Sequence, residues 1–420
     1  MGEPVPQGQR NARYKASELV VALEHADLVI ATLGGLGVGL GTVERSDDLG
    51  LGLLRLRDDK AAAQMTEKIE ERIGKEPAHD PEPRERPTEL DRLLTALRRD
   101  FALSYAGWIP TLGKNRLLGS IEGGGQIGHS GEDDPEPTTW RMHGRTARRP
   151  GLGVRVGVLD TAVFPHPDFE GRWIGSPADV LDREPEHPIG GHGTFVTGLV
   201  LRKAPGCTVE VCKALSDDGT AESWDVAKKI VELGRTGLDV LNLSMVCWSE
   251  DSQPPLVLAT AIDRLDPDIV VVAAAGNHGN VDEEKYPGQR NKPAWPAALD
   301  DVIAVGAADD EGDPAKFTPP DAPWVDVWSN GVDVSSTFPN GVDAILQGAA
   351  PDAKEFQGYA KWSGSSFAAA LVSGAIAAGT VPGRTPARAA WNELRGRAKE
   401  ESAKEQVARP RRPPFLQLLS

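Results

Sequence analysis

The stretch at residues 361–379, "KWSGSSFAAALVSGAIAAG", decides how this chain is interpreted. Three serines, Ser363, Ser365 and Ser366, come before a run of small and apolar residues. A helix that is apolar and small on several faces is typical of a buried, central position. Its N-terminus would present unpaired N–H groups and the positive end of the helix dipole, which suits an oxyanion. A serine there becomes a nucleophile only when another residue supplies a base.

Upstream of this stretch, from Gly153 onward, short β-branched runs alternate with helical stretches. Runs such as "VRVGVLD" and "DIVVVAAAG" are almost continuously apolar. This alternation predicts a parallel sheet that is covered by helices on both faces. Ligands of such a fold bind at the carboxyl ends of the strands, so the chemistry is sought there.

Polar residues stand at or near those strand ends. Asp160 ends "VRVGVLD", where a carboxylate is costly unless it has a partner. His192 lies between glycines in "GGHGTF", and imidazole is suited to proton transfer near neutral pH. Asn277 follows "VVVAAAG", and its amide could donate to an oxyanion. Each alone is more typical of a turn or a structural side chain; the order Asp, His, Asn and Ser366 carries the prediction.

That order and the surrounding words resemble the subtilisin-like serine peptidases, the subtilases. The matching words are "VGVLDTAVFPHPDF", "GGHGTFVTGLV", "VVAAAGN" and "SGSSFAAALVSG", and the resemblance runs from about Gly153 to Gly379. It implies an α/β fold, a subtilisin-like mostly parallel sheet with helices on both faces, preceded by a small α+β domain. It also implies a serine endopeptidase that hydrolyses peptide bonds.

The resemblance assigns roles to the four residues. Ser366 is the expected nucleophile, His192 the general base, and Asp160 the group that orients the imidazole. Asn277 and the backbone N–H of Ser366 are the expected oxyanion hole. An extended substrate is expected to pair with two strands of the family's fold. The residues of these strands are Leu243, Ser244, Met245, Val246, Ala274, Ala275 and Gly276.

Several positions depart from the family pattern. Ala162 stands where the family usually has glycine, and Ala370 stands where it has proline. Val246 replaces a glycine at the end of the substrate strand. Its branched side chain either narrows the first pocket or tilts outward, and the sequence leaves both open. These departures bear on substrate range more than on the triad.

The chain is expected to fall into four segments. Residues 1–75 read as strand–helix–strand–strand–helix, a small α+β domain that is propeptide-like or accessory. Residues 76–150 read as a linker, a helix and a loop-rich connector, 151–384 as the catalytic domain, and 385–420 as a C-terminal helix and tail. The element order of 1–75 resembles subtilase propeptides, which implies intramolecular inhibition; a partner-binding domain is the alternative.

Composition excludes other classes of protein. The net charge of −16 argues against nucleic acid as a partner. Three cysteines are too few for a disulfide framework, and they suit a reducing compartment. We identify no signal-peptide pattern and no apolar run long enough to cross a bilayer, so a cytoplasmic protein without a membrane partner is expected.

The expected partner is a peptide or protein substrate, and restricted intracellular processing is the favoured role. No cofactor is expected for catalysis and no metal ligands are assigned. Subtilases often bind calcium, but no ligand pattern for it stands out among the carboxylates. Two alternative functions stay open. One is a catalytically silent binding protein with this fold, and the other is a peptide ligase or cyclase that passes the same acyl-enzyme to an amine.

Overall fold

The computed structural model describes residues 14–58, 60–74, 87–120, 134–142, 149–182, 188–284, 288–341, 355–405 and 414–419. The chain divides into two compact units. The first combines Met1–Leu117 with Glu222–Lys228 and Pro255–Arg264. The second combines Leu118–Ala221, Lys229–Pro254 and Leu265–Ser420.

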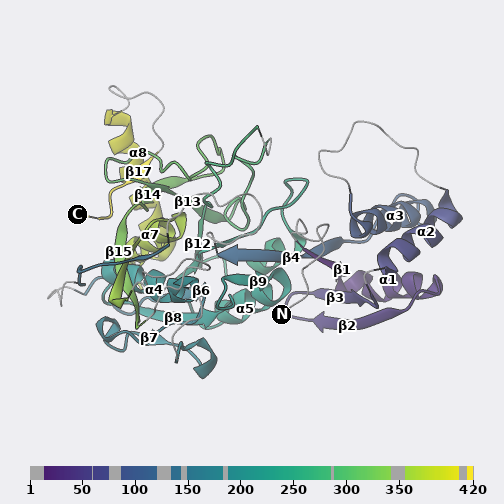
Figure 1. Ribbon diagram of the computed structural model, residues 1–420, viewed down its shortest axis with the longest axis horizontal. Helices are drawn as coiled ribbons and strands as arrows, with labels where there is room; N and C mark the ends of the chain where they lie inside the picture. Colours follow the sequence, from purple (N-terminus) through teal and green to yellow (C-terminus); the bar gives the residue numbers. More distant parts are fainter. Residues whose placement is uncertain are drawn as a thin grey trace. The chain divides into compact units, whose positions relative to one another are not determined.

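The second unit is built on an eight-stranded sheet with strand order β17-β14-β13-β12-β10-β6-β8-β7 (Figure 1). Neighbouring strands of this sheet all pair in parallel, which confirms the predicted α/β architecture. The central strands are almost wholly buried, as expected for a sheet covered on both faces. The strands are β6 (Arg155–Asp160), β7 (Trp173–Ile174), β8 (Thr208–Lys213), β10 (Val240–Leu243), β12 (Val270–Ala274), β13 (Val302–Ala308), β14 (Val327–Asn330) and β17 (Phe415–Leu416).

The register of the central strands brings their carboxyl ends to one edge of the sheet. Leu243, the last residue of β10, lies opposite Leu159 of β6 on one side and Ala273 of β12 on the other. The residues that follow β6, β10 and β12 therefore leave the sheet at the same level. This edge is where the sequence predicts the site.

Helix α7 (Ser365–Gly379) is the predicted central helix, and its residues 365–377 are all buried. It packs against β10, β12, β13 and β14 and against α4 (His192–Lys203). A Cβ atom added at Gly374 would lie 2.8 Å from the backbone oxygen of Val200, so the small residue lets the two helices approach closely. Helix α8 (Ala387–Glu405) also belongs to this unit, whereas α6 (Leu256–Asp263) belongs to the first unit and α5 (Ser223–Gly234) has residues in both. The short 3-10 helices of the second unit are η1 (Pro167–Phe169), η2 (Pro177–Asp179) and η3 (Pro188–Gly191).

A three-stranded antiparallel sheet leads the chain into α7. Its strands are β15 (Val334–Asn340), β16 (Gln357–Trp362) and β5 (Glu136–Pro137), with β16 in the middle. Strand β16 ends at Trp362, three residues before α7 begins at Ser365. Strand β16 therefore positions the short loop of residues 363–364 that leads into α7.

The C-terminal tail, which follows the predicted C-terminal helix, forms an edge strand of the large sheet. Strand β17 pairs in parallel with β14. The Ser329 hydroxyl donates to the Leu416 carbonyl at 3.0 Å, and the backbone N–H of Leu418 donates to Asn330 Oδ1 at 2.7 Å. Side chains of β14 thus bind the tail in addition to the backbone pairing of β14 with β17.

The first unit is an antiparallel sheet with helices, in the order expected for its first five elements. Strands β4, β1, β3 and β2 lie side by side in that order (Figure 1). The elements are β1 (Tyr14–Ala22), α1 (Leu23–Gly35), β2 (Leu40–Ser46), β3 (Leu51–Leu56), α2 (Ala61–Ile73), α3 (Glu89–Ser104) and β4 (Leu112–Ser120).

The first unit extends past the boundary that the sequence predicts at residues 75–76, a position outside the described residues. Helix α3 contributes Leu93 and Leu97 to the same core cluster as Leu19 of β1 and Leu54 of β3. Thr88 caps α3 through a reciprocal pair of hydrogen bonds with Asp91. The predicted connector thus begins with a helix that belongs to this core.

Strand β4 was missed, because the sequence predicts only loop over residues 106–150 after the helix. Its first half, "LGKN", has glycine and polar residues of low strand propensity. Long-range partners make it a strand. Asn115 is fully buried, donates to Glu18 Oε2 at 2.6 Å and Glu222 Oε2 at 2.9 Å, and accepts from the Trp224 N–H at 3.0 Å. A buried amide satisfied in this way is stable in a sheet.

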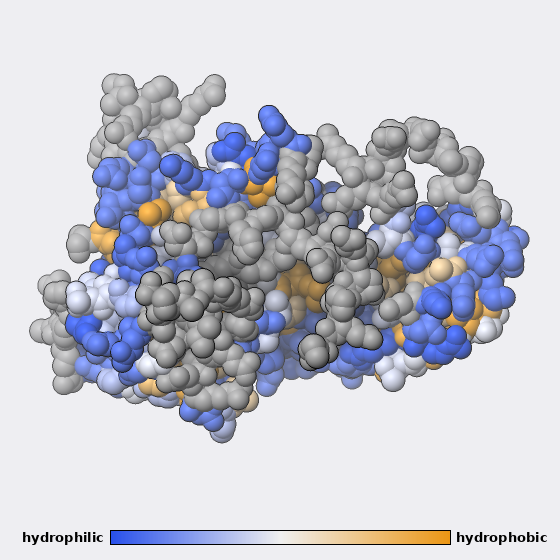
Figure 2. Space-filling model, viewed as in Figure 1, coloured by the Kyte–Doolittle hydropathy of each residue, from blue (hydrophilic) through white to orange (hydrophobic). Residues whose placement is uncertain are grey.

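The visible surface of the described residues is mostly hydrophilic, with separate apolar patches (Figure 2). This agrees with the net charge of −16. Across the part of the chain that the structure describes, no helix combines the length and the apolar character that a membrane crossing requires.

Candidate active site

The four predicted residues come from four elements of the second unit. Asp160 is the last residue of β6, His192 is the first of α4, Asn277 follows β12, and Ser366 is the second residue of α7. Each of the four is at most 3% exposed. Polar groups buried to this extent need partners or a chemical role.

Asp160 and His192 form a buried hydrogen-bonded pair. His192 Nδ1 lies 2.7 Å from Asp160 Oδ1, and the same oxygen accepts from the backbone N–H of Thr161 at 2.7 Å. An ionised carboxylate only accepts, so the hydrogen of this contact belongs to Nδ1. Nε2 is then left as the basic nitrogen of the imidazole.

The glycine after His192 allows this approach. The backbone N–H of Gly193 donates to Thr161 Oγ1 at 2.9 Å. A Cβ atom at Gly193 would lie only 2.4 Å from the Thr161 carbonyl oxygen, which no ordinary side chain tolerates. The start of α4 is therefore docked directly on the residue that follows Asp160.

Asn277 is joined to the start of α7 through its carbonyl. Its Oδ1 accepts from the backbone N–H of Ser365 at 3.1 Å, and Ser365 Oγ accepts from the backbone N–H of Gly276 at 3.1 Å. The donor of this amide is its Nδ2 group, which takes no part in these two bonds. Among the described residues, neither Asn277 Nδ2 nor Ser366 Oγ has a hydrogen-bond partner.

A chain of buried hydrogen bonds ends on the Ser366 carbonyl. Of its members, the sequence predicted only Ser244 as a site residue. Ser244 Oγ donates to the Ser366 carbonyl at 3.2 Å, and Asn242 Nδ2 donates to Ser244 Oγ at 2.9 Å. Ser373 Oγ in turn donates to Asn242 Oδ1 at 3.0 Å. The available signal was Asn242, a lone polar residue inside the apolar strand "VLNLS".

The predicted substrate-binding residues lie at the ends of β10 and β12 and in β11 (Met245–Val246). Gly276 has φ +88°, a conformation that favours glycine. Val246 is fully buried in the main hydrophobic cluster. The predicted substrate-binding residues are Leu243, Ser244, Met245, Val246, Ala274, Ala275 and Gly276.

Strand β11 is already paired, with a segment of the same chain. Within the second unit, Gly119 lies opposite Val246 and Ser120 lies opposite Met245, in antiparallel register. Leu118, the residue before this pair, is 2% exposed, whereas Leu117 is 39% exposed. Sequence reasoning did not find this segment, because it lay in the region predicted as loop.

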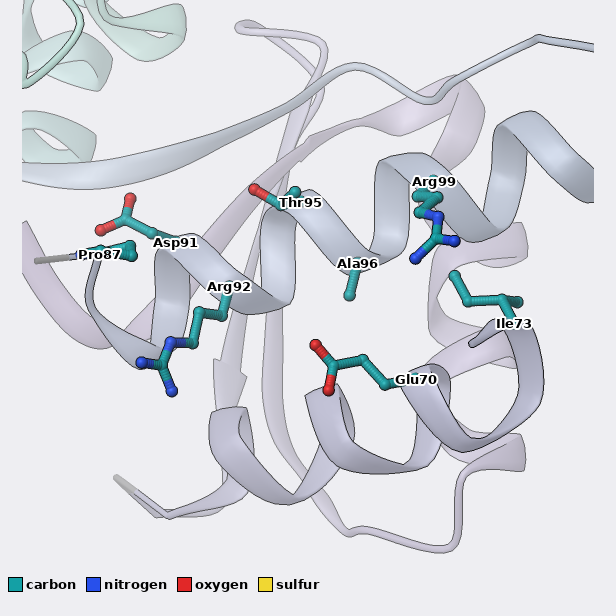
Figure 3. A pocket seen from close by; sticks show the side chains of 8 residues that line it. All are labelled: Glu70, Ile73, Pro87, Asp91, Arg92, Thr95, Ala96 and Arg99. Atoms are coloured by element: carbon teal, nitrogen blue, oxygen red, sulfur yellow. The ribbon is translucent and has the colours of Figure 1, made fainter. Parts of the chain in front are cut away.

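Other features of the described residues do not add to the site. They contain no group of three or more His, Cys, Asp or Glu side chains arranged to hold a metal ion. A cavity of about 240 Å³ lies between α2 and α3 in the first unit (Figure 3). Glu70, Arg92 and Arg99 are among its lining residues, and none of the predicted site residues is.

The three cysteines form no disulfide; Cys207 and Cys247 are buried and Cys212 is half-buried. Burial raises the pKa of Cys207 to about 12 and that of Cys212 to about 11. Thiols with such pKa values are almost wholly protonated at neutral pH and are poor nucleophiles. The chemistry of the site therefore falls to oxygen and nitrogen groups.

The chain is similar in sequence to known proteins. The model of the subtilase family matches residues 151–405. Subtilisin BL from Lederbergia lenta is 32% identical over 208 residues, which are 47% of this chain and 71% of that protein. An alkaline protease from Alkalihalobacillus alcalophilus is 31% identical over 239 residues, 52% of this chain and 58% of that protein.

One solved structure is similar over most of the chain. Fervidolysin from Fervidobacterium pennivorans, a keratinolytic enzyme related to subtilisin, aligns with a TM-score of 0.56 and 18% identity. The alignment covers 89% of this chain and 55% of that one. At this identity the likeness concerns the fold alone. Its extent means that the similarity of fold continues into residues before the 151–405 match.

Proposed function

The chain belongs to the subtilase family and is a serine endopeptidase, and from that premise we propose that Ser366, His192 and Asp160 are its catalytic triad. As Ser366 Oγ attacks the substrate carbonyl, His192 Nε2 takes its proton and later gives it to the leaving amine. Asp160 holds Nδ1 and stabilises the imidazolium. The 2.7 Å contact between Asp160 and His192 is the observation that carries the proposal.

We propose that Asn277 Nδ2 and the backbone N–H of Ser366 stabilise the oxyanion. Two features support this. The amide of Asn277 is oriented by the Ser365 N–H on its Oδ1, which leaves Nδ2 to donate. Ser366 lies in the first turn of α7, where the helix dipole favours negative charge. Such preorganised donors contribute most when water is excluded, and this site is buried.

Labelling with a fluorophosphonate tests the triad. The expected result is a single adduct on the intact chain, with a bond from Ser366 Oγ to phosphorus and loss of fluoride, located by peptide mapping. An activated serine is required because a free hydroxyl reacts poorly. A folded chain that takes up no label at any serine, both as the native protein and as the Leu118→Asp variant described below, would favour the silent binding protein instead.

We further propose that the intact chain inhibits itself through residues 118–120. The sequence places this role in residues 1–75, whereas the support comes from the pairing of β4 with β11. Because the pairing is antiparallel, β4 runs toward Ser244, whose hydroxyl is bonded to the Ser366 carbonyl. This is the direction in which the acyl half of a substrate would approach the nucleophile, so β4 competes with substrate for the same strand.

Leu118→Asp in the full chain tests this inhibition, with Leu117→Asp as the matched control. Burial of a leucine contributes about 1.5–3 kcal/mol, which corresponds to about a 10- to 100-fold change in occupancy of the strand. Leu118→Asp is therefore expected to raise the rate of fluorophosphonate labelling at least about tenfold. Leu117→Asp, at an exposed position, should leave it within about twofold. Equal rates for both variants and the native chain would contradict the proposal.

We also propose restricted processing in the cytoplasm. Three cysteines that form no disulfide suit a reducing compartment. A site covered by its own chain suits limited rather than general proteolysis. The measurement is identification of new N-termini after the active enzyme is added to a cytoplasmic extract. A small set of sites with a shared sequence is expected; cleavage of most proteins at dispersed sites would show a general degrader.

A further inference from the structure

The imidazole of His192 contacts two aromatic side chains, Trp362 and Phe367. The ring centroid of Trp362 lies 5.7 Å from that of His192 at an interplanar angle of 81°, and that of Phe367 lies 5.5 Å away at 41°. Trp362 and Phe367 also contact each other, with centroids 5.3 Å apart. The imidazole and the two aromatic rings thus form a triangle in which each ring contacts the other two.

The two aromatic side chains are themselves held from behind. Phe195, one turn along α4 from His192, lies 4.4 Å from Phe367 and 5.8 Å from Trp362 between ring centroids. All four side chains are at most 2% exposed. They come from α4, β16 and α7, so the triangle joins the element of the base to the element of the nucleophile.

Hydrogen bonds do not by themselves fix the plane of the imidazole. Asp160 holds one atom, Nδ1, at 2.7 Å. Within the described residues Ser366 Oγ has no hydrogen-bond partner, so the serine does not hold Nε2. A ring anchored at one atom can still tilt about that contact. Two rings packed against the imidazole, Trp362 edge-to-face at 81° and Phe367 tilted at 41°, restrict this tilt.

We propose that Trp362 and Phe367 are positioning residues that hold the His192 imidazole with Nε2 toward Ser366. This inference rests on the triad proposed above. Their task covers both proton transfers, because the ring must keep its direction while it receives the Ser366 proton and while it returns that proton to the leaving amine. Their aromatic faces also suit the imidazolium that exists between the two steps.

Plain core packing is the competing explanation, and the same core offers a control for it. Phe356 lies 4.5 Å from Phe338 between ring centroids and is 1% exposed. Phe338 in turn contacts Trp362 at 6.2 Å. Phe356 therefore belongs to the same aromatic core, two rings away from His192. Truncating the Phe356 side chain removes buried apolar area and leaves the contacts of His192 unchanged.

The experiment compares Trp362→Leu and Phe367→Leu with Phe356→Leu, with Trp362→Phe as the conservative rescue. Active enzyme is first counted by fluorophosphonate stoichiometry, which corrects for any unfolded fraction. A misplacement of about 1 Å in a catalytic group costs about 100-fold in rate. We expect kcat to fall about 10- to 100-fold in Trp362→Leu and Phe367→Leu with KM within about threefold. Trp362→Phe should recover most of kcat.

Phe356→Leu should lower the melting temperature as much as the other two while leaving kcat within about twofold. Equal losses of kcat in all three leucine variants, or losses that vanish after the active-enzyme correction, would overturn the positioning role. If Trp362→Leu does not fold, Trp362→Phe and Phe367→Leu decide the question by the same comparison. Failure to label at Ser366 in both the native chain and Leu118→Asp would instead overturn the triad, so the two failures are distinguishable.

Discussion

Ser366→Ala is expected to abolish peptide hydrolysis, with kcat lowered on the order of 10⁶-fold. The substitution removes the only atom that can form the acyl-enzyme in the proposed mechanism. It should hardly change stability, because among the described residues Ser366 Oγ makes no hydrogen bond that would be lost. The measurements are kcat with a peptide substrate and the melting temperature of the same samples.

The neighbouring serine is the matched control, and it should behave in the opposite way. Ser365 Oγ accepts from the backbone N–H of Gly276 at 3.1 Å in a fully buried position. Ser365→Ala leaves that N–H unsatisfied, which costs about 1–3 kcal/mol of unfolding free energy. Activity should stay within about tenfold, because no reacting atom is removed. If Ser365→Ala is the inactive variant and Ser366→Ala retains turnover, the assignment of the nucleophile is wrong.

The parallel sheet and α7 could be predicted because their signals are local. The runs that form β6, β10 and β12 are mostly apolar, as is typical of strands buried on both faces. Helix α7 has small or apolar residues on every face, and this pattern predicts a buried helix. The four site residues were found by their order along these elements, which the shared carboxyl edge of the sheet turns into proximity.

The missed features depend on partners far away in the sequence. Strand β4 has a poor local strand propensity. It forms because its polar side chains find partners far away in the sequence, such as buried Glu18, which accepts a hydrogen bond from Asn115 at 2.6 Å. The contacts of His192 with Trp362 and Phe367 join positions that only the folded sheet brings together. No period or spacing in the sequence encodes a contact between such distant rings. The occupied substrate strand could not be predicted for the same reason.

Asn277→Ala is expected to lower kcat about 100- to 1000-fold with KM within a few-fold, because it removes one donor to the oxyanion. The interaction is made in the transition state more than with the bound substrate, so the loss appears in kcat. The alanine also strips the Ser365 N–H of its acceptor, the Oδ1 atom at 3.1 Å. That second loss costs about 1–3 kcal/mol of stability. Steady-state kinetics and thermal unfolding of one preparation measure both effects.

Asn277→Asp separates the two effects, because a carboxylate keeps the acceptor for the Ser365 N–H and lacks the donor. Its unfolding free energy should stay closer to the native value than that of Asn277→Ala. Its kcat should be at least as low, since a negative charge would stand beside the developing oxyanion. Full activity in Asn277→Asp would mean that Asn277 acts only by holding the start of α7. Low kcat in both Asn277→Ala and Asn277→Asp, with stability preserved in Asn277→Asp, would support the donor role, because the bond that positions Ser365 is then intact.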